Sequence, residues 1–170
     1  PSIGLTTKWG ITPNLTLGGI VNPDFSQVEA DALQLDINEP FALYFSEKRP
    51  FFTEGADFFD TRINAVYTRS IREPLWGVKF SGKEGTHTIG SYVVQDELTN
   101  LIFPSAEGSD DISLNEKSYA SVIRYKKDIS NKYTLGTLLT DREGSNYYNR
   151  FYSADGNLRV TEKDRISFQA

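Results

Sequence analysis

Three carboxylates set among phenylalanines are the residues of this sequence best suited to acid–base chemistry. Residues 45–59 read F-S-E-K-R-P-F-F-T-E-G-A-D-F-F and place Glu47, Glu54 and Asp57 around two Phe pairs. Two carboxyl groups flanking a bound sugar, with aromatic rings as platforms, would make a glycoside hydrolase. The adjacent Lys48-Arg49 favours a different interpretation, because neighbouring acids and bases tend to satisfy one another as ion pairs. We therefore predict no catalytic residue and keep a glycoside hydrolase as an alternative.

The same charged and aromatic stretch fits a structural staple. Arg49 and Glu54 lie on either side of Pro50 and two phenylalanines, a spacing that suggests an ion pair shielded by aromatic rings. Removing one partner of a shielded pair costs more stability than breaking a pair on the surface. The residues predicted to form the staple are Glu47, Arg49, Glu54, Phe51 and Phe52.

Two other candidate sites have simpler explanations. Residues 77–83, G-V-K-F-S-G-K, spell most of a phosphate-binding loop, but Glu84 stands where Ser or Thr should hold magnesium, so we predict strand and turn. His87 lies in a predicted strand, and we interpret it as a pore-facing or surface residue, although a triad with distant partners is possible in principle. With one histidine and no cysteine, the chain is expected to need no metal and no cofactor.

Charge is distributed unevenly along the chain. The net charge of −5 argues against nucleic acid as a partner, because binding to phosphates needs clustered Lys and Arg. Residues 22–60 hold nine acids against two bases, and residues 117–170 hold ten bases against six acids. The acids of residues 22–60 are also those that the hydrolase alternative would use. We expect residues 45–59 to lie on the concave side of a curved sheet, facing basic side chains from this list: Arg124, Lys126, Arg150 and Arg159.

Period-two alternation dominates the sequence and predicts strands. In residues 133–140, for example, Leu135 and Leu139 alternate with Thr134 and Thr140. Turn residues separate the runs and predict hairpins at 128–131, 143–146 and 154–157, the last from an Asp-Gly pair. The predicted strands are 3–10, 14–22, 27–37, 63–70, 75–81, 86–96, 117–127, 132–142, 147–154, 157–162 and 165–170.

Two stretches fall outside the strand rhythm. Residues 39–60 are predicted to be an irregular insertion with a short helix near Ser46–Arg49, where Ser46 would be the N-cap. Residues 97–116 are predicted to be a long polar loop. The fold class is therefore an all-β antiparallel meander in a single domain, residues 1–170.

The strands mix polar and apolar residues on both faces. Thr, Gly, Tyr, Ser and Arg are interspersed with a few aliphatics, which is typical of barrel strands that face lipid on one side and a polar lumen on the other. The expected sheet is thus a fragment of a β-barrel or a barrel-like curved sheet. A soluble β-sandwich or half-barrel that binds carbohydrate on aromatic platforms remains an alternative.

Three specific stretches resemble a known bacterial envelope family. They are K-W-G-I-T-P-N-L-T-L at residues 8–17, V-N-P-D-F-S-Q-V-E-A-D at 21–31 and F-S-E-K-R-P-F-F-T-E-G at 45–55. The chain resembles the family known as domain of unknown function 5916, with Ser46 where members often carry Pro. The resemblance is dense over residues 4–60 and thinner beyond them.

The resemblance implies a place in the cell but no activity. It implies the first part of an outer-membrane β-barrel of a longer protein, in a region that usually follows a sugar-binding module of the family-nine carbohydrate-binding type. The expected function is that of a non-catalytic barrel segment in the bacterial outer membrane, with lipid as partner and a glycan as possible ligand. Because cut sheet edges expose unpaired strands, we expect the isolated chain to form an edge-paired homodimer or larger assembly.

Overall fold

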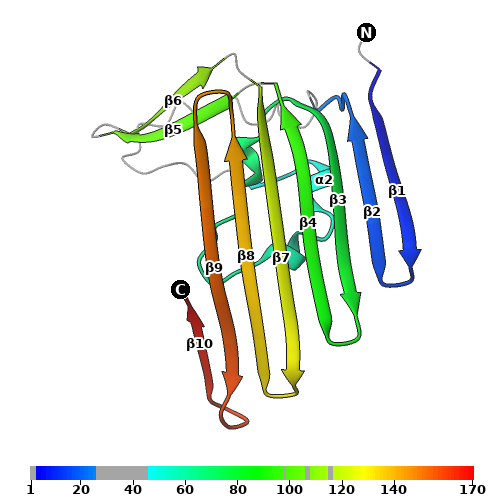
Figure 1. Ribbon diagram of the computed structural model, residues 1–170, viewed down its shortest axis with the longest axis vertical. Coiled ribbons are helices and arrows are strands. Elements are labelled where there is room, and N and C mark those ends of the chain that lie inside the picture. The colour runs from blue at the N-terminus through cyan, green and yellow to red at the C-terminus, as the bar shows by residue number, and fades with distance from the viewer. Residues whose placement is uncertain (1–2, 26–45, 98, 106–107, 115–116) are drawn as a thin grey trace.

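Eight strands form one antiparallel sheet in the order β1-β2-β3-β4-β7-β8-β9-β10, and β5 and β6 form a separate two-stranded sheet (Figure 1). The computed structural model describes residues 3–25, 46–97, 99–105, 108–114 and 117–170. The strands are β1 Leu5–Thr12, β2 Leu15–Val21, β3 Pro74–Glu84, β4 His87–Asp96, β5 Thr99–Ser105, β6 Gly108–Leu114, β7 Ser118–Ser130, β8 Tyr133–Glu143, β9 Tyr148–Arg159 and β10 Arg165–Gln169. The predicted all-β antiparallel meander is confirmed.

Short turns set the register of the meander. Pro13 and Asn14 form the turn between β1 and β2, as their turn preferences predict. Gly85, with φ of 57°, lies in the turn between β3 and β4, where a backbone in the left-handed region suits glycine. The predicted hairpins at 128–131 and 143–146 are confirmed as the β7–β8 and β8–β9 connections.

Three predictions about strands are wrong. Residues 97–116 contain the β5–β6 hairpin, because a paired ribbon satisfies its backbone without needing apolar alternation. Residues 63–70 pair with no strand of the sheet, and their end is the 3₁₀ turn η3, Thr68–Ser70; Ala65 and Val66 instead pack on the core. The third error concerns residues 154–157, which lie inside the continuous strand β9. The strand predicted at 27–37 falls outside the described residues.

One connection covers a face of the large sheet. Residues 46–73, here called the covering segment, run between β2 and β3 through α2 Pro50–Thr53, η2 Ala56–Phe59 and η3. The helix begins after Arg49 rather than at Ser46, because a proline fits the first helical turn and holds the residue before it extended. In Figure 1 this segment lies behind the sheet.

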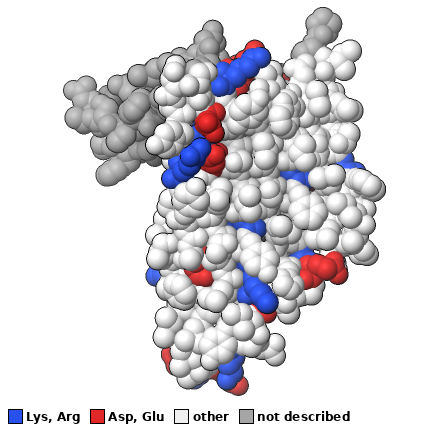
Figure 2. Space-filling model, in the orientation of Figure 1, with Lys and Arg blue, Asp and Glu red and all other residues white. Residues whose placement is uncertain are grey.

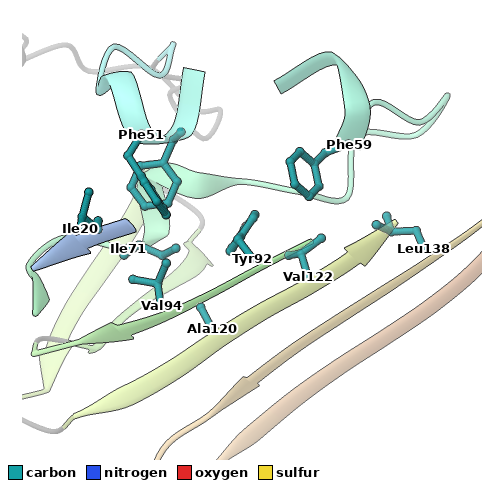
Figure 3. Close-up of a cluster of buried hydrophobic side chains, with 10 residues drawn as sticks. Ile20, Phe51, Phe59, Ile71, Tyr92, Val94, Ala120, Val122 and Leu138 are labelled. Atoms are coloured by element: carbon teal, nitrogen blue, oxygen red, sulfur yellow. The ribbon is translucent and has the colours of Figure 1, made fainter. Parts of the chain in front are cut away.

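The hydrophobic core lies between the covering segment and this face, which we call the inner face. Figure 3 shows phenylalanines of the covering segment pointing toward side chains of the strands. The buried apolar side chains are Ile20, Phe51, Phe52, Phe59, Ile71, Tyr92, Val94, Ala120, Val122 and Leu138. Edge-to-face aromatic contacts join Phe52 and Phe59 to Tyr92, with ring centroids 6.1 and 5.3 Å apart. The segment is therefore packed as part of the fold.

Candidate functional site

Arg49 connects the two ends of the covering segment by hydrogen bonds. Its side chain is fully buried, and its Nε and Nη2 donate to the two carboxylate oxygens of Glu47 at 2.9 and 2.7 Å. Nη1 donates to the carbonyl of Ile71 at 2.6 Å, and Nη2 also donates to the carbonyl of Thr68 at 2.8 Å. The guanidinium carbon lies 4.4 Å from the ring centroid of Phe52. One side chain thus joins residues from both ends of the segment.

Glu47 is held as a carboxylate by its neighbours. Besides the two bonds from Arg49, it accepts the hydroxyl of Thr68 at 2.6 Å and the backbone N–H groups of Lys48 and Arg49. Burial by itself would raise the pKa of Glu47, but the hydrogen bonds from Arg49 and Thr68 outweigh it and lower the pKa to about 2. The charged form is therefore the stable one in the folded protein.

The predicted pair between Arg49 and Glu54 is wrong. Glu54 instead pairs with Lys8 of β1, at 2.9 Å, with both side chains more than half exposed. The reason is geometric, since α2 turns the chain between the two residues and directs Glu54 toward β1. Of the predicted staple, Glu47, Arg49, Phe51 and Phe52 come together, and Glu54 does not join them.

Lys79 anchors α2 to the sheet. It rises from the inner face of β3, and its ammonium donates to the carbonyls of Phe51 and Glu54, the latter at 2.5 Å. These carbonyls lie at the end of a short helix, where backbone acceptors lack partners within the helix. Burial lowers the pKa of Lys79 to about 8, with the Glu54 charge opposing and Lys8 assisting. The alternation of polar and apolar residues in the sequence did not mark Lys79 as a structural or functional residue.

Asp96 and Arg142 anchor the far end of the covering segment. The buried carboxylate of Asp96 accepts the backbone N–H groups of Arg72 and Glu73 at 3.1 and 2.7 Å. Arg142 donates to Asp96 at 3.1 Å and to the carbonyl of Ser70 at 2.9 Å. Burial raises the pKa of Asp96, and the bonds from Glu73 and Arg72 and the charge of Arg142 oppose that rise. The pair therefore ties strands β4 and β8 to the segment.

A second buried ion pair crosses the sheet from β7 to β9. Arg124, 2% exposed, donates from both terminal nitrogens to Asp155 at 2.5 and 2.8 Å, while its Nε has no hydrogen-bond partner. Gly136 of β8 makes room between them, because a Cβ there would lie 2.5 Å from the Arg124 guanidinium. Asp155 therefore belongs to a strand, although Asp-Gly usually marks a turn.

The predicted docking of the acidic stretch onto basic strands is wrong in its partners. Arg124 is paired with Asp155, and Arg150 pairs with Asp141 and Glu143 on the opposite face of the sheet. The covering segment is instead contacted by Lys8, Lys79 and Arg142 of the strands, and its own Arg49 pairs with Glu47. Sequence reasoning missed Lys8, Lys79, Asp96, Arg142 and Asp155, which are single polar residues at alternating strand positions without a local motif.

The two motif-like candidates lie in strands. Residues 77–83 belong to β3, where Lys83 pairs with Asp128 at 2.6 Å, so the prediction of a strand there is confirmed. His87 lies on the face opposite the covering segment, with Nδ1 at 2.6 Å from the hydroxyl of Tyr125. Within the described residues no three His, Asp or Glu side chains gather as a metal site would require, and no helix there is long and apolar enough to cross a membrane.

Comparison with known protein families gives a match over the first three fifths of the chain. Residues 1–102 match the family described as Domain of unknown function (DUF5916). The chain belongs to this family. The matched DUF5916 region includes β1 to β4 and the covering segment, and thus the Glu47–Arg49 pair, Lys79 and Asp96. No curated protein and no solved structure matches the chain.

Proposed function

We propose that the chain is a non-catalytic wall segment of a bacterial outer-membrane β-barrel. Its support is the face opposite the covering segment, here called the outer face, which Figure 2 shows as predominantly uncharged. Exposed apolar side chains lie on this face in every strand of the large sheet and include Leu5, Trp9, Val21, Val78, Val93, Ile123, Leu135, Tyr152, Ile166 and Phe168. An apolar surface this broad needs a covering, and lipid chains are a suitable one.

Hydrogen-bonded aromatic residues border this apolar surface. At one end, Trp76 donates to Gln95, and Gln95 donates to the hydroxyl of Tyr119, at 2.8 and 2.9 Å. At the other end lie His87 and Tyr125. Gln95 lies eight positions after His87 in β4, or about 27 Å along an extended strand. With a strand tilt of about 40°, this becomes roughly 20 Å of height, close to the apolar band of barrel proteins.

The apolar surface crosses the strands obliquely. Strand register aligns Leu5 of β1 and Val21 of β2 with Glu143 of β8, where the surface is charged. On β8 and β10 exposed apolar side chains lie toward the opposite end, at Leu135 and Phe168, and the charged end of β9 carries tyrosines, which suit the edge of a membrane band. A membrane band that is level in the bilayer must cross tilted strands in this oblique way.

The inner face has the opposite character and suits a lumen. Buried charged groups on it have partners: Arg124 pairs with Asp155, Asp96 pairs with Arg142, and Lys79 donates to backbone carbonyls. The covering segment lies over this face as a plug would. An eight-stranded barrel is filled by its own side chains, so a lumen that also holds this segment requires more than the eight strands of this sheet. We accordingly propose that the edge strands β1 and β10 pair with further strands.

The carboxylates give little support to glycoside hydrolysis. A general acid needs a raised pKa, whereas the pKa of Glu47 is lowered to about 2 and that of Glu54 is lowered by Lys8. Both groups are held in ion pairs. We therefore propose a non-catalytic role.

Tryptophan fluorescence offers a direct test of the lipid-facing surface. The chain has two tryptophans, Trp9 and Trp76, and strand register places both on the outer face. In bilayers that contain brominated lipids, we expect quenching of both, with Trp9→Phe and Trp76→Phe leaving one reporter each. Aqueous iodide should quench them less in bilayers than after unfolding in urea. Strong iodide quenching without any effect of brominated lipid would contradict the proposal.

A charged residue placed on the outer face tests independently whether this face contacts lipid. Ile123→Arg should destabilise the protein folded in bilayers by about 2–4 kcal/mol, because the side chain lies within the apolar band. Tyr148→Arg places the same residue at the edge of the band and should cost about 0–1 kcal/mol. Equal effects of the two substitutions would argue against a membrane spanning this surface.

A further inference from the structure

A groove of about 300 Å³ lies beside the covering segment, over the inner face of β1, β2 and β3. Its floor comes from β1, β2, β3 and the β1–β2 turn, and its wall comes from α2 and residues 54–58. Thr6, Thr16 and Ser81 present hydroxyl-bearing side chains to it, and Pro50 and Phe58 are apolar wall residues. The groove therefore combines hydrogen-bonding groups with an apolar wall.

Two ammonium groups belong to this groove. Strand register places Lys8, Gly18 and Lys79 side by side on β1, β2 and β3. A Cβ at Gly18 would meet other atoms only at 3.9 Å or more, so its missing side chain leaves the space between the lysines open. Lys79 is fixed by the carbonyls of Phe51 and Glu54. The groove thus offers positive charge at a defined position in its floor.

A single carboxylate partly balances these two charges. Glu54 pairs with Lys8 at 2.9 Å, and their side chains are 54% and 58% exposed. Exposed pairs of this kind contribute little stability, so another carboxylate can replace Glu54 at small cost. Lys79 remains in place meanwhile, because its hydrogen bonds are to backbone carbonyls. The lining residues Lys8, Lys79 and Glu54 leave the groove with one net positive charge.

We propose that this groove binds a small organic anion that carries both a carboxylate and hydroxyl groups. The ligand carboxylate takes the place of Glu54 on Lys8, near the positive charge of Lys79. Its hydroxyl groups bond with Thr6, Thr16 and Ser81, and its carbon chain lies along Phe58. The residues proposed to contact the ligand belong to the inner face and the covering segment, so these contacts do not depend on what covers the outer face.

Calorimetry on the purified protein with gluconate, which has a carboxylate and five hydroxyl groups, tests the site. Sorbitol is the matched probe without the carboxylate. We expect Lys8→Gln to weaken gluconate binding about tenfold, because it removes a charge-assisted hydrogen bond. Glu54→Gln should strengthen binding several-fold, because it removes the competing carboxylate. Lys132→Gln, which removes the same charge from the β7–β8 turn, should leave binding unchanged.

The opposite signs at Lys8 and Glu54 separate a ligand site from a structural ion pair. If the pair were only structural, both substitutions would change the melting temperature slightly and neither would alter gluconate affinity. Thr16→Val tests the hydroxyl contacts and should weaken gluconate binding without changing the net charge. The proposal is overturned by absence of gluconate binding, by sorbitol binding as tightly as gluconate, or by Glu54→Gln binding no tighter than the unaltered chain.

Discussion

Arg49 and Glu47 form a two-point ion pair in which the guanidinium is fully buried and the carboxylate side chain is 15% exposed. The same guanidinium bonds the carbonyl of Ile71, 22 residues further along the chain. The pair therefore does more than neutralise charge. It fixes the two ends of the covering segment at one point and leaves the phenylalanines between them to pack on the sheet.

Arg49→Ala should destabilise the protein by about 3–5 kcal/mol, because it leaves the carboxylate of Glu47 without its partner in a largely buried place. Chemical unfolding measured by far-ultraviolet circular dichroism gives the free energy. Glu54→Ala is the matched control, since it breaks an exposed pair and should cost about 0–1 kcal/mol. Similar losses from both substitutions would show that the Arg49 pair behaves like a surface pair.

Acid should lower the stability of the protein through the protonation of Glu47. The pKa of this carboxyl is lowered from 4.5 to about 2, so its contribution to stability is complete above pH 4.5 and is lost as the pH falls toward 2. Glu47→Gln should remove that part of the pH dependence while lowering stability at neutral pH. Urea unfolding at several pH values measures both effects. An unchanged acid profile in Glu47→Gln would rule out this carboxyl as the source.

Raising the pH above 8 should increase the stability of the protein through Lys79. Its pKa is lowered from 10.5 to about 8 by burial, so between pH 8 and 10.5 the unfolded chain holds a proton that the folded chain has released. Stability linked to this group should therefore rise with pH across that window. Lys79→Met should abolish the rise, and the exposed control Lys132→Met should retain it. A rise that persists in Lys79→Met would assign it to another group.

Gly136→Ala should destabilise the protein by about 1–3 kcal/mol through overpacking. The new Cβ would lie 2.5 Å from the guanidinium of Arg124, which is buried and bound to Asp155 and so cannot move without breaking that pair. Gly10→Ala is the control, because its Cβ would meet its nearest atom at 3.7 Å. Thermal unfolding of the two variants compares them, and equal melting temperatures would show that Arg124 adapts freely.

Much of the fold can be read from local sequence. Alternation locates β1, β2, β3, β4, β7, β8 and β10 to within a few residues, and turn residues such as Pro13 and Asn14 locate their connections. These features are local because the pleat of a strand and the dihedral preferences of turn residues act over a few positions. The hairpin β5–β6 escapes this reading, since its apolar residues form the short run Leu101-Ile102-Phe103 and a single alternation at Ile112 and Leu114 among mostly polar residues.

The candidate site depended on contacts between residues distant in sequence. Asp155-Gly156 has the composition of a turn, yet Arg124 from two strands away in the sheet holds Asp155 within β9. Arg49 had acids on both sides in sequence, and the direction of the chain through α2 selected Glu47 over Glu54. The sequence shows which acidic and basic residues are available for pairing. Which of them pair is decided by the packing of the covering segment on the sheet, because an ion pair needs its atoms within a few ångströms and away from competing water.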